Sequence, residues 1–355
     1  MAEPLLEIKD VRVDFEVRDG TVHAVDGVTY TVNRGETLGV IGESGCGKSV
    51  TAKAVMQMIP KPGKIVSGKI LYHRRDKFDP SKPAEIVDIT NLDPDGSTIR
   101  SIRGGEFAMI FQEPMSSLTP VYTTGTLIGE ALDLHRRIPV GDQMADRIMQ
   151  YRPVTKEEAR QISIDMLHKV GIPKPEERVD AYPHQLSGGQ RQRVMVAIAL
   201  SCEPFMLIAD EPTTALDVSI EAQILDLMRD LQESVDMAIM FITHNLGVVA
   251  EMANEIVVMY MGKQVEKAST VKIFYEPKHP YTRALLQSIP KVGKRSSERL
   301  ASIKGMVPDP FHLPSGCVFH PRCPSFMPGK CDRIVPSWIE VEPDHWARCL
   351  LYENV

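Results

Sequence analysis

The sequence predicts an α/β fold built around a mainly parallel β-sheet. Short apolar runs at 37–41, 107–111, 205–209 and 238–242 have the length and composition of buried strands. They alternate along the chain with segments of helical spacing, which favours parallel strands with helices on both faces of the sheet. Polar residues follow these runs directly, at the sheet edge where α/β proteins usually bind ligands.

The composition excludes several classes of protein. The 355 residues are 43% apolar and 25% charged, which is ordinary for a globular chain with one large domain and a smaller one. A net charge of −6 gives no electrostatic reason to expect nucleic acid as a partner. No apolar run reaches the roughly 18 residues of a spanning helix, and residues 1–4 do not resemble the start of a signal peptide. We therefore expect a cytoplasmic protein.

The first 41 residues predict strands joined by tight turns. Apolar residues alternate with polar ones, first from Ile8 to Val17 and again from Val22 to Val32, and Asp19-Gly20 between them is a hairpin turn signal. Residues 73–105 are polar and rich in turn formers, which predicts a surface excursion. Residues 125–181 are mainly helical in pattern and are expected to form a separate lobe.

The stretch from Gly42 to Ser49 fits the pattern Gly-x-x-x-x-Gly-Lys-Ser/Thr of a phosphate-binding P-loop. An apolar strand precedes it, and residues 50–58, which lack Gly and Pro, follow as a predicted helix. In this context the glycines let backbone N–H groups turn toward a phosphate, and the helix N-terminus adds partial positive charge. We expect Lys48 to reach the β- and γ-phosphates and Ser49 to be a magnesium ligand.

Polar groups at three other strand ends are candidates for the same chemistry. Asp210 and Glu211 follow an apolar run, and there Asp210 would hold magnesium while Glu211 would polarise an attacking water. Gln112 and His244 follow apolar runs in the same way and are candidate γ-phosphate and water contacts. Each of them alone is also consistent with an ordinary polar residue at a strand end.

The order of these motifs resembles that of the ATP-binding-cassette (ABC) ATPases. Between the P-loop and Asp210, residues 186–190 read Leu-Ser-Gly-Gly-Gln and open a helix that reaches about Leu200. Ser187 would cap this helix whatever else it does. The resemblance covers residues 5–265 and implies a P-loop NTPase of ABC type, with an antiparallel β subdomain and an inserted helical subdomain at about 113–200.

The resemblance implies a role for each motif. Gln112 would be the Q-loop glutamine, Glu211 the catalytic glutamate and His244 the switch histidine, whereas residues 215–217 resemble the D-loop. The implied catalytic residues are Glu211, His244 and Gln112, and the implied magnesium ligands are Ser49, Gln112 and Asp210. The implied ATP contacts are Phe15, Gly42, Ser44, Gly45, Gly47, Lys48, Ser49, Val50, Gln112, Asp210, Ser187, Gly189 and Gln190.

Three positions in this scheme carry an alternative or a departure. Phe15 is the candidate for stacking on adenine, with a core aromatic on an edge strand as the alternative. Cys46 occupies a variable P-loop position, and we expect it and Cys202 to be structural, with a reactive thiol at Cys46 as the alternative. Asn245 follows the histidine where Asp is common in the family.

A closer resemblance is to the first of the two ATPase subunits of dipeptide and oligopeptide importers. Residues 111–120, 182–185 and 279–286 carry it; they read FQEPMSSLTP, YPHQ and HPYTRALL. It implies a subunit at the cytoplasmic face of the membrane that hydrolyses ATP to power peptide import. The alternatives are an importer ATPase for nickel or another solute, and a soluble ABC ATPase that acts on DNA or ribosomes.

The resemblance also implies partners. They are a second, non-identical ATPase subunit, two transmembrane permease subunits and, indirectly, an extracytoplasmic peptide-binding protein, without nucleic acid. In the resembled family Gly42–Ser49 binds ATP in its own chain, whereas Ser187 and Gly189 of a partner cassette cap the γ-phosphate. The isolated chain should therefore hydrolyse ATP poorly.

Residues 266–355 are expected to form a small loop-rich domain, because prolines recur throughout them. Four cysteines in a reducing compartment argue against disulfides and suit a bound metal, although no Cys-x-x-Cys pair is present. The resemblance implies a four-iron four-sulfur cluster, and His312, His320 and His345 are spare ligands that keep zinc as the alternative. The predicted cluster ligands are Cys317, Cys323, Cys331 and Cys349.

Overall fold

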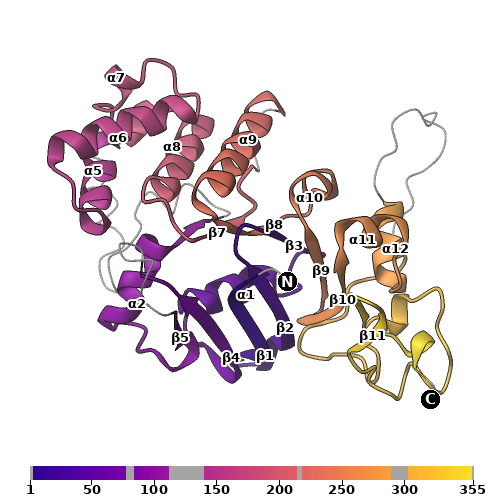
Figure 1. Ribbon diagram of the computed structural model, residues 1–355. Helices are drawn as coiled ribbons and strands as arrows, with labels where there is room; N and C mark the ends of the chain where they lie inside the picture. Colours follow the sequence, from indigo (N-terminus) through magenta and orange to yellow (C-terminus); the bar gives the residue numbers. More distant parts are fainter. Residues whose placement is uncertain (1–2, 77–83, 112–139, 214–217, 289–302, 354–355) are drawn as a thin grey trace, which may run out of the picture. The chain divides into compact units, whose positions relative to one another are not determined.

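The computed structural model describes residues 3–76, 84–111, 140–213, 218–288 and 303–353. The chain forms two compact units (Figure 1). Unit 1 comprises residues 1–33, 37–91 and 241–355, and unit 2 comprises residues 34–36 and 92–240. Within the described ranges, no helix combines the length and the apolar character needed to cross a membrane. Gln112 and residues 215–217 lie outside the described residues.

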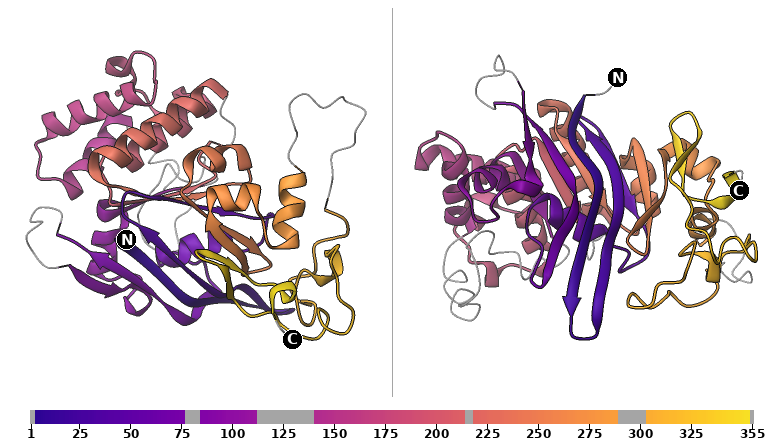
Figure 2. Two further views of the ribbon diagram at one scale, coloured as in Figure 1. Left: turned by 45° about the vertical axis from the view of Figure 1, so that its right-hand side comes forward. Right: turned by 90° about the horizontal axis from the view of Figure 1, so that it is seen from below.

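Unit 1 contains an antiparallel sheet in the order β2-β1-β4-β5. β1 (Pro4–Val17) and β2 (Gly20–Asn33) pair along their lengths as the long hairpin visible in Figure 2, so the predicted hairpin is confirmed. Its turn is one residue earlier than predicted, at Arg18 and Asp19, because Gly20 already pairs with Val17. β4 (Gly63–Arg74) pairs with β1, and β5 (Glu85–Asp88), which η1 (Ile89–Asn91) follows, pairs with β4. The predicted surface excursion therefore contributes an edge strand. Val87 buries its side chain and the neighbouring Ile86 stays exposed, as expected when successive side chains of a strand point to opposite faces.

A second set of strands in unit 1 has the order β11-β12-β10-β9-β3. β3 (Thr37–Ile41) is buried throughout and pairs in parallel with β9 (Glu255–Tyr260), as the apolar run predicts. β10 (Lys263–Ser269), β12 (His345–Ala347) and β11 (Ile339–Glu342) continue the set with antiparallel pairing. The predicted domain boundary at 265/266 lies inside β10, so the C-terminal extension, which we define as residues 266–355, contributes strands to the set that contains β3.

The helices of unit 1 are short. They are α1 (Lys48–Val55), α10 (Leu246–Met252), α11 (Thr270–Tyr275) and α12 (Pro280–Gln287), with single turns at η4 (His320–Arg322) and η5 (Leu350–Tyr352). α1 ends earlier than the sequence predicts because Gln57 has a left-handed backbone, with φ of 50°. Tyr260, Tyr281 and Phe319 bury their rings in one core cluster, which joins β9 to two parts of the extension, α12 and the segment around Phe319.

Unit 2 is mainly helical. In Figure 1, α5 (Val140–Tyr151), α6 (Lys156–Lys169) and α8 (Gly188–Leu200) lie together, so the helical pattern is confirmed from residue 140 onwards. Along the chain, α7 (Pro175–Arg178) and η3 (Pro183–Gln185) come between α6 and α8. The unit also contains a parallel strand pair and three further segments. These are β6 (Phe107–Ile110) beside β7 (Met206–Asp210), then α2 (Ser97–Ser101), η2 (Ile102–Glu106) and α9 (Val218–Val235). β8 (Ala238–Ile242) crosses the boundary between the units.

Candidate functional site

Three glycines shape the loop between β3 and α1. Gly42, Gly45 and Gly47 have φ angles of 152°, 79° and 99°, which residues with a side chain rarely adopt. A Cβ atom at Gly47 would lie 2.3 Å from the carbonyl oxygen of Ala24, and one at Gly42 would lie 2.2 Å from that of Met259. Because both neighbours are backbone atoms, the loop excludes larger residues at these two positions.

Lys48 begins α1 and turns its side chain back over the loop. Its Nζ atom donates hydrogen bonds to the carbonyl oxygens of Gly42, at 2.8 Å, and Glu43, at 3.0 Å, and the residue is buried. No side chain caps α1, whose N-cap is the left-handed Gly47. A buried ammonium group beside an uncapped helix N-terminus concentrates positive charge, which is suited to phosphate.

Four of the predicted loop residues are at least partly exposed, whereas Gly42, Gly47 and Cys46 are buried. Ser44 and Gly45 are exposed, and Ser49 and Val50 are half-buried. Cys46 is buried, and burial raises the pKa of its thiol, which disfavours the reactive thiolate and supports a structural role.

Phe15 and His244 also belong to unit 1. Phe15 is half-buried, and a Cβ atom at Gly63 would lie 2.5 Å from its ring, so the ring packs closely over that glycine. His244 is exposed just beyond β8. Asn245 then caps α10 by accepting hydrogen bonds from the backbone of Gly247 and Val248, which explains how the chain accommodates Asn where Asp is common.

Unit 2 holds the predicted carboxylates. Asp210 ends β7 and is buried, and Glu211 follows with a left-handed backbone, φ 51°. Such a conformation is uncommon for a residue with a side chain and redirects the chain as it leaves the strand. The carbonyl oxygen of Pro212 accepts a 2.6 Å hydrogen bond from the buried side chain of Gln192, which ties α8 to this turn.

The signature stretch in unit 2 begins with a self-capped helix. The Ser187 hydroxyl accepts a hydrogen bond from the Gln190 backbone at 3.3 Å, and the Gln190 side chain accepts one from the Ser187 backbone at 3.0 Å. This reciprocal pair is a capping box, so the predicted capping role of Ser187 is confirmed. Ser187 and Gly188 are exposed, and Gly189 is half-buried.

The cysteines predicted to bind the cluster all lie in one region of the extension. The backbone N–H of Cys317 donates to the carbonyl of Cys331 at 2.8 Å. Burial, with a smaller effect of the neighbouring thiols, raises the pKa of Cys317 to about 11 and that of Cys349 to about 12. Metal ligands must be thiolates, so binding of a metal would have to displace these protons. Among the described residues, no three His, Cys, Asp or Glu side chains are grouped to hold a metal, so the predicted metal-binding domain is not supported.

The three spare histidines have other partners. His320 is hydrogen-bonded through Nδ1 to the Cys317 carbonyl oxygen, at 3.0 Å, and His312 to Asp309. His345 is buried and bonded to Glu266 at 2.7 Å. Each of these contacts uses one ring nitrogen and fixes the orientation of the imidazole.

Sequence reasoning missed two contacts between the extension and the P-loop. The Arg322 guanidinium is paired with the Glu43 carboxylate, and the Tyr281 hydroxyl accepts a hydrogen bond from the Glu43 backbone. Tyr281 lies in a stretch that the sequence singled out, 279–286, but Arg322 carries no local signal because it is 279 residues from Glu43 along the chain.

Two family comparisons agree with this geometry. The ABC transporter family matches residues 25–214, and the C-terminal region of oligopeptide/dipeptide transporters matches residues 265–331. A glycine loop between a buried strand and an uncapped helix, together with the capped signature helix, defines a P-loop ATPase of the ABC type. The chain therefore belongs to the ABC transporter family, in the branch that carries the oligopeptide/dipeptide C-terminal region.

Individual relatives extend over almost the whole chain. The dipeptide transport ATP-binding protein DppD of Escherichia coli is 44% identical, covering 97% of this chain and 96% of its own. DppD of Bacillus subtilis is 42% identical over 99% of this chain and 96% of its own, and a putative peptide import ATP-binding protein of Brucella melitensis is 44% identical over 99% and 98%.

Solved structures agree in fold. A dimeric ATP-binding cassette with bound ADP and Pi superimposes with a TM-score of 0.60, at 20% identity over 75% of this chain and 99% of its own. CbiO1 of Clostridium perfringens gives a TM-score of 0.56, at 25% identity over 77% and 92%.

Proposed function

We propose that this chain is the ATP-binding and ATP-hydrolysing subunit that powers import of di- or oligopeptides through a membrane permease. The observation that carries the proposal is the P-loop, where Gly42 and Gly47 leave no space for a side chain and a buried lysine stands at a helix N-terminus. The peptide cargo is proposed from the matching C-terminal region and from relatives named for peptide and dipeptide transport.

Each site residue has a proposed role. Lys48 leaves its carbonyl partners for the β- and γ-phosphates, and Glu211 polarises the attacking water. His244 and Gln112 take the catalytic roles that the resemblance implies. The side-chain oxygens of Ser49, Asp210 and Gln112 suit Mg²⁺, a hard cation that neutralises phosphate charge when it is bound. Phe15, which is half-buried, is the proposed stacking partner of adenine.

The proposed assembly places the chain at the cytoplasmic face of the membrane. It contains two permease subunits and a second, non-identical ATPase, and a peptide-binding protein outside the membrane delivers the cargo. Ser187 and Gly189 cap the γ-phosphate held by the partner cassette. Copurification of the chain with permease subunits tests the assembly, whereas copurification with DNA or ribosomes would contradict it.

Replacing Glu211 by Gln tests the catalytic assignment. ATP binding should remain, and turnover by the assembled transporter should fall by about 10² to 10⁴, because the general base is lost. Nucleotide titration and phosphate release measure the two properties. Glu203→Gln, which alters an exposed carboxylate near Arg152, is the matched control and should retain turnover. Normal turnover by Glu211→Gln would sink the assignment.

A four-iron four-sulfur cluster on Cys317, Cys323, Cys331 and Cys349 is a separate proposal, with zinc as the alternative. Binding would have to deprotonate thiols whose pKa values burial raises and draw them toward one another. Iron and sulfide analysis with a visible spectrum, after anaerobic purification, tests it. Four irons and four sulfides for each chain are expected, and a colourless protein with stoichiometric zinc would replace the iron–sulfur assignment.

A further inference from the structure

Glu43 is a P-loop residue whose carboxylate is held by the C-terminal extension. Arg322 forms a two-pronged ion pair with it, at 2.7 Å and 3.0 Å between nitrogen and oxygen atoms. The Arg322 side chain is only 4% exposed and that of Glu43 is 23% exposed. A fork of this kind is specific to arginine and is stronger than a single contact.

Arg322 is itself fixed by its surroundings. It ends the single turn η4, directly before Cys323, and donates further hydrogen bonds to the Tyr260 hydroxyl and the Lys304 carbonyl. Tyr260 packs edge-on against Phe319, with ring centroids 5.2 Å apart. The contacts with Tyr260 and the Lys304 carbonyl therefore hold the Arg322 guanidinium in position beside Glu43, and Phe319 in turn supports Tyr260.

The backbone of Glu43 is held as well. Its N–H donates to the hydroxyl of Tyr281 at 2.9 Å, and its carbonyl accepts from Lys48 at 3.0 Å. The carboxylate, the N–H and the carbonyl of this one residue thus all have partners. When Lys48 moves to a phosphate, Tyr281 and Arg322 still hold Glu43, together with the Cys46 backbone N–H, which donates to the Glu43 carbonyl at 3.3 Å.

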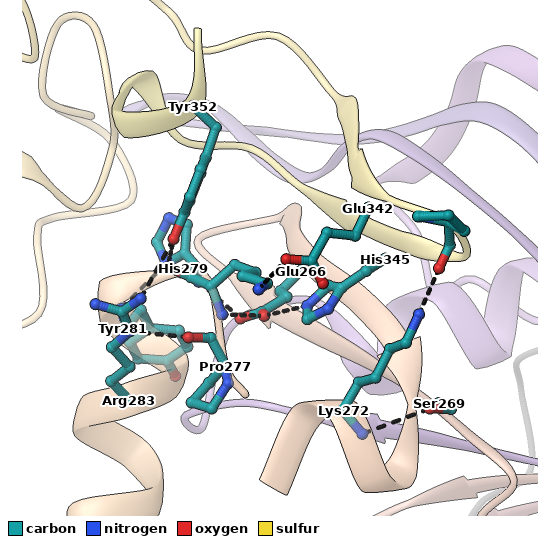
Figure 3. Close-up of polar contacts among 12 residues, drawn as sticks. Glu266, Ser269, Lys272, Pro277, His279, Tyr281, Arg283, Glu342, His345 and Tyr352 are labelled. Atoms are coloured by element: carbon teal, nitrogen blue, oxygen red, sulfur yellow. Dashed lines mark hydrogen bonds and ion pairs between the residues drawn. The ribbon is translucent and has the colours of Figure 1, made fainter. Parts of the chain in front are cut away.

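Tyr281 is anchored in turn by a buried polar network (Figure 3). The Glu266 carboxylate accepts hydrogen bonds from the backbone of Lys278 and His279 and is bonded to the His345 ring. His279 then caps α12 by accepting a hydrogen bond from the Tyr281 backbone at 3.0 Å. Glu266 and His345 are 0% exposed, so water does not compete for these contacts.

We propose that Arg322 is a positioning residue for ATP binding, which neutralises Glu43 and keeps its carboxylate turned away from the phosphates. The proposal rests on the proposed role of Gly42–Ser49 in binding phosphate. Without Arg322, an unpaired carboxylate inside the loop repels the polyphosphate, and the repulsion is strong because the site is partly shielded from water. The extension is then part of the nucleotide site, although its cysteines are not.

Arg322→Met in the full-length chain is the central test. We expect the affinity for a fluorescent ATP analogue, measured by titration, to fall about tenfold. Adding Glu43→Gln should restore most of the loss, because the repelling charge is gone, and Glu43→Gln alone completes the cycle. A role of Arg322 in packing alone would give the same loss in both backgrounds, and that result overturns the proposal, as does unchanged affinity in Arg322→Met.

Three further variants make the result decisive. Arg322→Lys keeps the charge and loses the fork, so it should lose about threefold in affinity, and it replaces Arg322→Met if that variant does not fold. Arg333→Met, at an exposed arginine of the extension, should bind like the wild type. Lys48→Met distinguishes failure of the P-loop assignment from failure of the Arg322 proposal. If Lys48→Met binds ATP normally, the P-loop assignment fails, and the Arg322 proposal fails with it. If Lys48→Met loses affinity but Arg322→Met binds ATP normally, only the Arg322 proposal fails.

Discussion

Two glycine-containing stretches each open a helix, but they treat its N-terminus in opposite ways. α1 has no side-chain cap and begins at a left-handed glycine, whereas α8 is closed by a reciprocal pair between Ser187 and Gln190. An uncapped N-terminus leaves backbone donors for a phosphate, and a capping box satisfies donors within the chain. The P-loop therefore has backbone donors available for an anion, whereas the first donors of the signature helix are already satisfied within the chain.

A third helix start extends the comparison. α12 is capped by His279, whose Nδ1 atom accepts the hydrogen bond from Tyr281. An imidazole can accept at Nδ1 only while that nitrogen carries no proton. The three helix starts thus depend on different chemistry: glycine geometry at α1, a hydroxyl cap at α8 and an imidazole cap at α12. Each can be disrupted by a separate substitution.

Gly47→Ala should have the largest effect. The new Cβ atom would meet the Ala24 carbonyl oxygen at 2.3 Å in a backbone conformation that already disfavours alanine. We expect ATP affinity to fall at least about a hundredfold, or about 2.7 kcal/mol. Gly45→Ala is the matched control, since it has a similar φ of 79° but no atom within 4 Å of the Cβ position. Equal affinities of the two variants, measured by nucleotide titration, would refute the steric explanation.

The His279 cap should make stability depend on pH. Burial lowers the pKa of His279 from 6.5 to about 4. Below pH 6.5 the imidazole of residue 279 becomes protonated in the unfolded chain but stays neutral in the folded chain. The free energy of unfolding therefore decreases as the pH falls from 6.5 to about 4. The loss amounts to about 3 kcal/mol. His279→Asn keeps an acceptor at the cap and removes the titration, so urea unfolding at stepped pH should show a weaker dependence. An identical pH profile in both proteins would count against this account.

Ser187→Ala should have the smallest effect on stability. Loss of the cap is expected to cost about 1 kcal/mol in urea unfolding. Thr155→Ala removes the matching cap of α6, where Thr155 and Glu158 form the same reciprocal pair, and should cost a similar amount. Only Ser187→Ala should also slow ATP turnover in the assembled transporter. Equal turnover in the two variants would show that Ser187 acts only as a helix cap and not in ATP hydrolysis.

Much of the nucleotide site could be predicted from local sequence. The P-loop, the strand that ends at Asp210 and the helix that Ser187 caps each depend on residues that are close together in the chain. Backbone sterics and capping act over a few residues, so a motif carries them. The hairpin of β1 and β2 was predictable for the same reason.

The C-terminal extension was less predictable, and its cysteines show why. Their spacing suggested a metal site, but among the described residues no three metal-ligating side chains are grouped to hold a metal. Spacing along the chain does not determine how the loops between the cysteines place the thiols. In the same way, Lys48 and the glycines follow from the sequence alone. The pairing of Arg322 with Glu43 was decided only by the tertiary structure. It depends on a core cluster in which Tyr260 of β9 packs against Tyr281 and Phe319 of the extension.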